Sequence, residues 1–328
     1  MKFNRGWQIK WRVGAAYAAI GLIWGSAWIP TEAVSRQLPL IETGILRFGL
    51  AALFLGVLTG ATNAWSGRPL LRGSLVGPAL LLGVTMLGLP YALTAWAADR
   101  VAPGVVPLLY GFMPLLVLLF EGENREPGIP SVVLGIGGVA MIAAPGLSFR
   151  WSQAGGVAAL LAAVCASGFS LVYVRRLYTR GRLEIRDLLP LSAIQLAVAC
   201  AFLVLLGACT GQVIPLHLEK AAALPIALLA IVVSGGTLPL VYWLLTRVAA
   251  WRLATLQWIA SLVALSEAAL FLRATPALEA WIGAILIPGC IVWIFLAGNA
   301  ETSQPVSLQI TDDTFSRRRA SDNEEKAR

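Results

Sequence analysis

Two long apolar stretches decide the fold class of this chain: SLVGPALLLGVTMLGLPYALTAWA at residues 74–97 and AALPIALLAIVVSGGTLPLVYWLLT at residues 222–246. Each exceeds the roughly 20 apolar residues that a helix needs to cross a bilayer. Each also carries a Leu-Pro pair, which ends at Pro90 in the first stretch and at Pro239 in the second. Because proline removes a backbone donor, and because glycines precede both pairs, the pattern predicts matching helix breaks that expose backbone polar groups to a cavity. The alternative is that both prolines form ordinary kinks that only improve packing.

The composition places most of the chain in lipid. Of its 328 residues, 58% are hydrophobic and 13% are charged, and the mean hydropathy is +0.77. Such a chain cannot hide its apolar surface in one soluble core. The short alternating segments of a barrel are absent, so we expect an all-α integral membrane protein. The ten predicted transmembrane helices cover residues 13–34, 41–61, 74–97, 102–120, 129–146, 153–174, 188–209, 222–246, 253–272 and 279–298.

The ten predicted spans form two groups of five. An odd number of spans in each group turns the second group upside down relative to the first, which is the layout of transporters built as two inverted five-helix repeats. We therefore expect a cytoplasmic N-terminus, a first repeat, a second repeat and a disordered cytoplasmic tail. Their predicted ranges are 1–12, 13–146, 147–298 and 299–328.

The distribution of Lys and Arg predicts the orientation. Nineteen of these residues lie on the side of the N-terminus, five lie on the opposite side, and Arg47 lies within a span. Because positive charge accumulates on the inner side, we expect a multi-pass protein of the cytoplasmic membrane with both termini in the cytoplasm. The uncharged stretch from Val13 to Thr31 exceeds the apolar core of a secretory signal, so we expect it to be a retained first span.

Several function classes find no support in the sequence. The net charge of +8 comes from residues beside apolar spans, which indicates topology and not nucleic-acid binding. There is no GxxxxGK[ST] motif, and the sole histidine, His217, falls in a predicted outer loop. The four cysteines lie in apolar runs without a CxxC pair. We therefore expect no enzyme activity, cofactor or metal site. The glycine pairs in the spans favour close helix packing but indicate no oligomeric state.

Charged residues inside predicted spans are the sharpest local signals, because inserting a charged side chain at the centre of a membrane helix costs roughly 2.5–3.5 kcal/mol of free energy. Arg47 and Glu267 stand out, and the predicted orientation places both toward the outer side. We interpret Glu267 as a candidate coupling residue, since a carboxylate in a low-dielectric cavity favours its protonated form and could exchange protons. If Arg47 pairs with it, the two would instead lock their helices together. A vestibule that attracts cations would also include Glu32, Glu42, Asp99 and Arg100, although end residues can simply snorkel to the interface.

Aromatic and amide side chains predict a cavity wall. Tyr91, Tyr110, Gln257 and Trp258 lie deepest within the predicted spans, and Trp24 of the first span is a further candidate for the wall. Cation–π contact with an amine is one use for such a wall. The alternative is that the aromatic residues belong to the interfacial belt of the membrane.

Four segments carry a family resemblance: LIWGSAWIPTEAV at 22–34, LRFGLAAL at 46–53, GFMPLLVLLFEGENRE at 111–126 and LLTRVAAWRLATLQWIASLVALSEAALF at 244–271. Together they resemble the EamA-type branch of the drug/metabolite transporter superfamily. The resemblance implies a ten-helix carrier with inverted repeats. It also implies a central cavity lined mainly by the third, fourth, eighth and ninth spans, and export of amino acids, amines or other small metabolites.

The resemblance extends to single residues. Trp24-Gly25 matches the family's first-helix signature, Arg47 its second-helix arginine, Pro114 its fourth-helix proline and Glu126 the acid after that helix. The chain departs from the pattern at three positions, where Glu32 stands in place of a lysine, Ser261 in place of a proline and Ala274 in place of an acid.

These observations predict a secondary transporter that binds a small-molecule substrate within the lipid bilayer and moves it outward by alternating access. Facilitated diffusion and coupling to protons both stay open. Within the same fold, a nucleotide-sugar or lipid-linked sugar transporter is the alternative, which would need a strongly basic cavity. A channel or a structural membrane subunit is the alternative from a different class.

Overall fold

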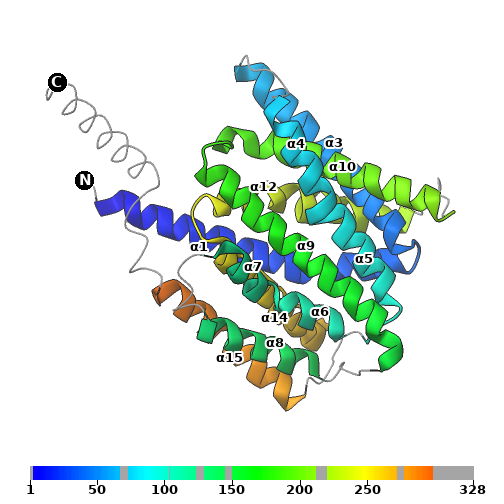
Figure 1. The fold of residues 1–328 in the computed structure, drawn as a ribbon, viewed down its shortest axis with the longest axis vertical. Helices are drawn as coiled ribbons and strands as arrows, with labels where there is room; N and C mark the ends of the chain where they lie inside the picture. The colour runs from blue at the N-terminus through cyan, green and yellow to red at the C-terminus, as the bar shows by residue number, and fades with distance from the viewer. Residues whose placement is uncertain are drawn as a thin grey trace, which may run out of the picture.

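A computed structural model describes residues 3–66, 73–102, 104–122, 129–144, 150–211, 220–271 and 277–297, and within these ranges the chain is helical and contains no strand (Figure 1). The elements of the first half are α1 (Phe3–Ser26), α2 (Trp28–Ser35), α3 (Leu40–Ser66), α4 (Gly73–Leu82), the π-helix η1 (Gly83–Gly88), α5 (Leu89–Ala98), α6 (Val105–Gly111), α7 (Met113–Glu121) and α8 (Ile129–Ala143). Those of the second half are η3 (Trp151–Gln153), α9 (Ala154–Thr179), η4 (Ile185–Asp187), α10 (Leu188–Cys209), α11 (Lys220–Ala227), the π-helix η5 (Leu228–Gly236), α12 (Thr237–Leu245), α13 (Ala250–Ala254), α14 (Leu256–Phe271) and α15 (Leu278–Ala297).

Six helical stretches are long and apolar enough to cross a membrane. They are Trp11–Ser35, Leu40–Thr62, Gly73–Ala98, Trp151–Thr179, Ile185–Cys209 and Lys220–Leu245. Shorter apolar helices cover Val105–Glu121, Ile129–Ala143 and Leu278–Ile294. Large apolar side chains remain exposed on them, for example Leu53 and Val57 on α3, which fits an outer surface that faces lipid. The prediction of an all-α membrane protein is therefore confirmed.

The helices differ from the predicted spans where they begin and where they are interrupted. α1 begins at Phe3, ten residues before the predicted first span at residue 13, while the apolar part of the helix, Trp11–Ser35, agrees with that span. The predicted fourth span is divided into α6 and α7 at Phe112, two residues before Pro114. Since Pro114 has no N–H to donate, the helix cannot continue its regular bonding there. The predicted ninth span is also divided, into α13 and α14 at Thr255, although no proline lies near this position.

Glycines allow the closest helix contacts. α1 packs along α14, where a Cβ on Gly25 would collide with the side chain of Val263. α8 packs along α15, where a Cβ on Gly283 would collide with the carbonyl oxygen of Gly138 (Figure 1). Such small residues let backbones approach where lipid provides no hydrophobic drive for helix association.

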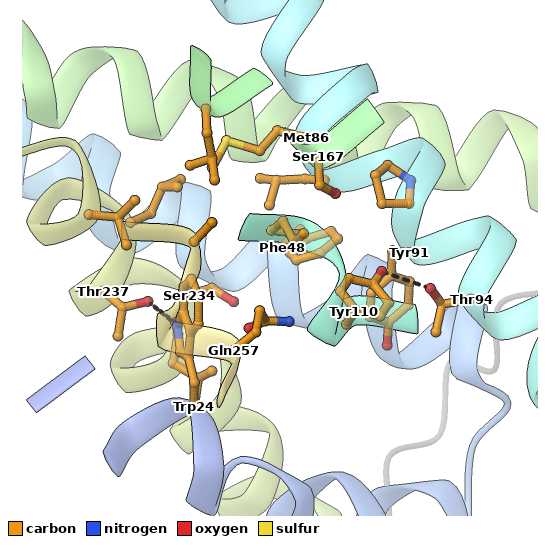
Figure 2. A pocket seen from close by; sticks show the side chains of 18 of the residues that line it. Trp24, Phe48, Met86, Tyr91, Thr94, Tyr110, Ser167, Ser234, Thr237 and Gln257 are labelled. Carbon is orange, nitrogen blue, oxygen red and sulfur yellow. Dashed lines mark hydrogen bonds between the residues drawn. The ribbon is translucent and has the colours of Figure 1, made fainter. Parts of the chain in front are cut away.

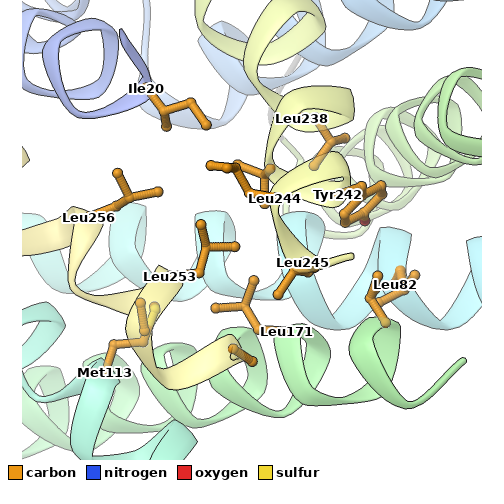
Figure 3. Close-up of a cluster of buried hydrophobic side chains, with 14 of the residues drawn as sticks. Ile20, Leu82, Met113, Leu171, Leu238, Tyr242, Leu244, Leu245, Leu253 and Leu256 are labelled. Carbon is orange, nitrogen blue, oxygen red and sulfur yellow. The ribbon is translucent and has the colours of Figure 1, made fainter. Parts of the chain in front are cut away.

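The buried core lies where helices of both halves meet. In Figure 3, Ile20 of α1, Met113 of α7 and Leu171 of α9 face Leu245 and Leu253 from the α12–α13 region. These side chains are at most 7% exposed. The core therefore joins segments far apart in the sequence and fixes the position of the cavity beside it.

Candidate functional site

A cavity of about 280 Å³ lies between the two halves of the chain (Figure 2). Side chains from α1, α3, η1, α5, α6, α7, α9, α10, η5, α12, α13 and α14 line it. Its walls are mostly apolar or aromatic, with a few hydroxyl groups, one amide and one guanidinium. The lining residues are Trp24, Arg47, Phe48, Met86, Leu87, Pro90, Tyr91, Thr94, Tyr110, Met113, Ser167, Leu171, Leu196, Val233, Ser234, Thr237, Leu238, Val241, Leu253, Ala254 and Gln257.

The two predicted helix breaks are π-helical turns. η1 ends directly before Leu89-Pro90, and η5 ends directly before the helix that contains Pro239. A π-turn widens the helix and changes the hydrogen-bond partners of the backbone, so it tolerates a missing proline donor better than a regular α-turn. The helices therefore continue through the prolines without unwinding. Pro90 lines the cavity, whereas Pro239 is not among its lining residues.

Side chains satisfy carbonyl groups beside the two π-turns. Thr85 donates to the carbonyl of Leu81 at 2.8 Å, and Gln195 Nε2 lies 3.4 Å from the carbonyl oxygen of Leu82. In the second half, the Thr237 hydroxyl donates to the carbonyl of Val233. These side-chain hydrogen bonds add to the backbone hydrogen bonding around both turns, and the one from Gln195 comes from another helix, α10.

Arg47 joins the two halves at the cavity. Its Nε donates to Ser234 Oγ at 2.7 Å, and its guanidinium carbon lies 5.7 Å from the centre of the Phe48 ring. The side chain is half-buried, and no acidic residue is found among the residues that line the cavity. The alternative in which Arg47 pairs with Glu267 does not hold among the described residues: Arg47 binds Ser234, and the Glu267 carboxylate binds Ser26 and Trp28.

Trp24, Tyr91, Tyr110 and Gln257 all lie on the cavity wall, as the sequence predicts. Trp24 Nε1 donates to the Thr237 hydroxyl at 3.0 Å, and the hydroxyl groups of Tyr110 and Thr94 are 3.0 Å apart (Figure 2). These hydrogen bonds fix the orientation of two aromatic rings. The fold therefore brings cavity-lining residues of α1, α5 and α6 in the first half together with Gln257 of α14 in the second half.

Trp258 does not line the cavity. It is 0% exposed, and its Nε1 donates to the carbonyl of Gly111 at 3.0 Å. Its ring fills the space above Gly135, where an added Cβ would collide with it. The packing of the ring on Gly135 and its hydrogen bond to Gly111 direct Trp258 toward α8 and α6, whereas the neighbouring Gln257 faces the cavity. The assignment of Trp258 to the cavity wall is therefore corrected to a core position.

The predicted outer acids are not part of the cavity wall. The Glu267 carboxylate accepts hydrogen bonds from Ser26 Oγ at 2.5 Å and from Trp28 Nε1 at 3.1 Å. Glu32 is exposed and pairs with Arg36 one helical turn away, at 3.3 Å. Glu42 is buried, and its Oε2 has no hydrogen-bond partner within the described part of the chain.

A cluster at the end of α7 was not predicted. The Glu121 carboxylate accepts from the backbone N–H groups of Ala250 and Trp251 at 2.9 and 3.1 Å, which caps α13. Arg175 of α9 lies 3.3 Å from the same carboxylate and donates to the carbonyl groups of Leu245 and Val248 at 2.9 and 2.6 Å. We call this arrangement the Glu121–Arg175 clasp; it ties α7 and α9 to the α12–α13 connection.

The other positions of the family pattern are only partly covered by the structure. Ser261 donates to the carbonyl of Gln257 at 3.0 Å within α14. Glu126 and Ala274 lie outside the described residues. Within the described part of the chain, no group of three or more His, Cys, Asp or Glu side chains could hold a metal ion.

Comparison with known proteins agrees with this architecture. A solved crystal structure, described only as that of a protein, is similar with a TM-score of 0.70 and 18% sequence identity, over 89% of this chain and 99% of its own. At that identity the likeness shows a shared fold. No curated protein matches the chain. Residues 12–143 match the model of the EamA-like transporter family, which confirms the predicted resemblance. These residues therefore belong to the EamA-like transporter family of the drug/metabolite transporter superfamily, and the chain is a multi-pass membrane protein.

Proposed function

We propose that the chain is a secondary transporter that exports a small metabolite, an amino acid, an amine or a related compound, across the cytoplasmic membrane by alternating access. Ten transmembrane helices would form two inverted five-helix repeats with both termini in the cytoplasm. The observation that carries the proposal is the cavity between the halves, beside the two π-helical turns. Substrate sites at the interface of two repeats, beside local irregularities of the lining helices, are typical of such transporters.

Repeated local structure supports two equivalent halves. The first half contains Pro78 in α4, the π-turn η1 and then Pro90 in α5. The second half contains Pro225 in α11, the π-turn η5 and then Pro239 in α12. The same order of proline, π-turn and proline at matching places is what an internal repeat would produce.

The packing partners support the same division. α3 packs on η5, and α10 packs on η1; α1 packs on α14, and α9 packs on α6 and α7. α5 and η1 pack on α9, whereas α12 and η5 pack on α1. The corresponding elements of the two halves are α1 and α9, α3 and α10, η1 and η5, and α5 and α12. When each element is exchanged for the corresponding one, the contacts of one half become those of the other. The contacts of α3 with α10 and of α8 with α15 join counterparts directly, as expected beside a two-fold axis.

Two polar clusters suit a carrier that opens at one end at a time. The Glu121–Arg175 clasp lies where α7 and α9 end, next to the start of α13. Glu267 lies near the far end of α14, about 16 Å along the helix from Leu256. There it binds Ser26 and Trp28, on either side of the break between α1 and α2. Rocking of the halves would break one cluster while the other holds.

The cavity favours a small metabolite over the alternative of a nucleotide sugar or a lipid-linked sugar. A diphosphate carries several negative charges, whereas the cavity wall presents one arginine as its charged residue. A volume of about 280 Å³ also lies just below the range of roughly 300–1,000 Å³ that is usual for ligand pockets, which leaves little room for a large ligand.

Reconstitution in vesicles tests the function. Vesicles are loaded with labelled amino acids and amines, and efflux is recorded against concentration with and without a pH gradient. Saturable efflux supports a carrier. Flux that rises linearly with concentration identifies a channel, and no flux of any solute in the panel would contradict the proposal.

The same assay tests proton coupling. We expect Glu267→Gln to abolish the response of saturable efflux to the pH gradient, while Glu32→Gln, an exposed control, retains it. Glu42→Gln serves as a second comparison, because it removes the charge of another buried carboxylate, whose Oε2 has no hydrogen-bond partner among the described residues. If Glu267→Gln transports with an unchanged pH profile, Glu267 is not the coupling residue.

A further inference from the structure

The cavity has an unbalanced positive charge. Arg47 is the charged residue on its wall, and neither an aspartate nor a glutamate is found among the lining residues. An arginine within a membrane span is costly unless it has a partner. Its described neighbours are the hydroxyl of Ser234, the ring of Phe48 and the phenol of Tyr91, and none of these groups is an acid.

The Arg47 guanidinium also has hydrogen-bond donors that no described residue uses. Only Nε has a hydrogen-bond acceptor among the described residues, the hydroxyl of Ser234 at 2.7 Å. The two terminal nitrogens make no hydrogen bond with any residue that the structure describes. A guanidinium with free terminal nitrogens can form the paired hydrogen bonds that suit a carboxylate.

The remainder of the wall suits an apolar body with a few polar atoms. Phe48, Tyr91 and Met113 provide aromatic and apolar surface, and Gln257 and Ser167 provide an amide and a hydroxyl. An amine in this cavity would find ring faces and neutral oxygens but no carboxylate, so the wall binds an anion far better than a simple cation.

We propose that Arg47 forms an anion subsite, so that the substrate carries a carboxylate on a mainly apolar or aromatic body, and that simple amines without a carboxylate are poor substrates. The subsite rests on the proposed transport function. Ser234 is the positioning residue, because it fixes Nε and leaves the terminal nitrogens for the ligand. Since Ser234 lies in η5, occupation of the subsite also places ligand contacts at one of the two π-turns.

Binding is tested with matched pairs of solutes. Purified protein in detergent is titrated with phenylalanine and phenylalaninamide, and with 3-phenylpropionate and phenethylamine, and thermal stabilisation is recorded at several salt concentrations. We expect the carboxylate of each pair to bind roughly 10-fold or more tightly than its partner, because charge-assisted hydrogen bonds are the strong ones. Equal stabilisation by both members, or stabilisation by neither, overturns the subsite.

Three variants locate the effect. Arg47→Gln should abolish the preference for carboxylates, and Arg47→Lys, which keeps the charge but not the planar fork, should retain part of it. Arg150→Gln changes an exposed arginine that is not part of the cavity wall and should bind as the original protein does. If Arg47→Gln folds poorly, Arg47→Lys and the unmodified protein still decide the question. An unchanged preference in Arg47→Lys and Arg47→Gln overturns the assignment of Arg47.

Transport measured on the same panel separates the two proposals. Saturable efflux of amines and amides that equals efflux of the carboxylates overturns the anion subsite but leaves the carrier function intact. Selective binding of carboxylates without flux of any bound solute supports the subsite and contradicts the carrier function.

Discussion

Arg47 Nε donates to Ser234 Oγ at 2.7 Å, and this bond connects α3 of the first half to the π-turn η5 of the second half. The bond lies on the cavity wall, so it couples ligand contacts to the relative position of the halves. A carrier needs such a link, because a ligand shifts an equilibrium between two conformations only through contacts that differ between them.

Removing the Ser234 hydroxyl should weaken substrate binding without removing the charge. For Ser234→Ala we expect the binding free energy of the substrate to become about 1–2 kcal/mol less favourable, which raises the KM for carboxylate efflux by roughly 5–30-fold. Ser234→Thr retains a hydroxyl and should keep a KM close to the original. Efflux kinetics in vesicles measure the difference, and an unchanged KM in Ser234→Ala would show that the bond does not position Arg47.

Thr237 should stabilise the second π-turn. Its hydroxyl accepts from Trp24 Nε1 at 3.0 Å and donates to the Val233 carbonyl. Thr237→Val keeps the shape but leaves both groups without this partner, so we expect the free energy of unfolding to fall by about 1–3 kcal/mol. Unfolding in mixed micelles measures it, with Thr237→Ser as the matched control. Equal stability of Thr237→Val and the original protein would refute this role.

Two neighbours in the sequence should behave in opposite ways. Trp258 is fully buried against Gly135, so Trp258→Ala should lower the free energy of unfolding by about 3–5 kcal/mol. Gln257 faces the cavity, so Gln257→Ala should change efflux kinetics with little effect on stability. Paired unfolding and efflux measurements test both. The placement of the two side chains is wrong if Gln257→Ala destabilises the protein and Trp258→Ala does not.

The Glu121–Arg175 clasp should keep its end of the cavity closed. Glu121→Gln removes the charge and can accept only one of the two N–H bonds through its amide oxygen. In Ala254→Cys, the new thiol lies on the cavity wall. We expect Glu121→Gln to make this thiol react roughly 5–30-fold faster with an impermeant maleimide added to the side of the clasp, because the closed conformation loses about 1–2 kcal/mol of stability. Labelling is measured on a background without other cysteines.

A control for the clasp is Glu184→Gln. Glu184 pairs with Arg186 in the connection between α9 and α10 and is more exposed than Glu121. Its substitution should leave the labelling rate at residue 254 unchanged. Equal acceleration by both variants would mean that general loss of charge, and not the clasp, opens the cavity.

Much of the fold was predictable because a chain in lipid forms long apolar helices, and these appear in the sequence as long apolar runs. The stretches around Pro90 and Pro239 were expected to break the helix, and both contain π-turns. The geometry of the helix at these positions also involves contacts with other helices, such as that of Gln195 with the carbonyl of Leu82. The sequence of a single span does not contain that information.

The site was predictable in part for the same reason. Trp24, Arg47 and Gln257 reach the cavity wall because polar and aromatic groups deep in a span avoid lipid. Trp258 could not be told from Gln257, since the rotation of α14 is set by packing at Gly135. The Glu121–Arg175 clasp was missed because it joins three segments that are distant in sequence, and only their arrangement in the fold brings them together.

Counterflow in vesicles tests the central claim of alternating access most directly. Vesicles that contain the protein are loaded with a high concentration of unlabelled substrate and diluted into a trace of the labelled form. A carrier whose single site faces one side at a time predicts a transient accumulation of label above its equilibrium level, and Arg47→Gln should abolish it for carboxylates. Label that only approaches equilibrium, at a rate proportional to its concentration, would contradict the account.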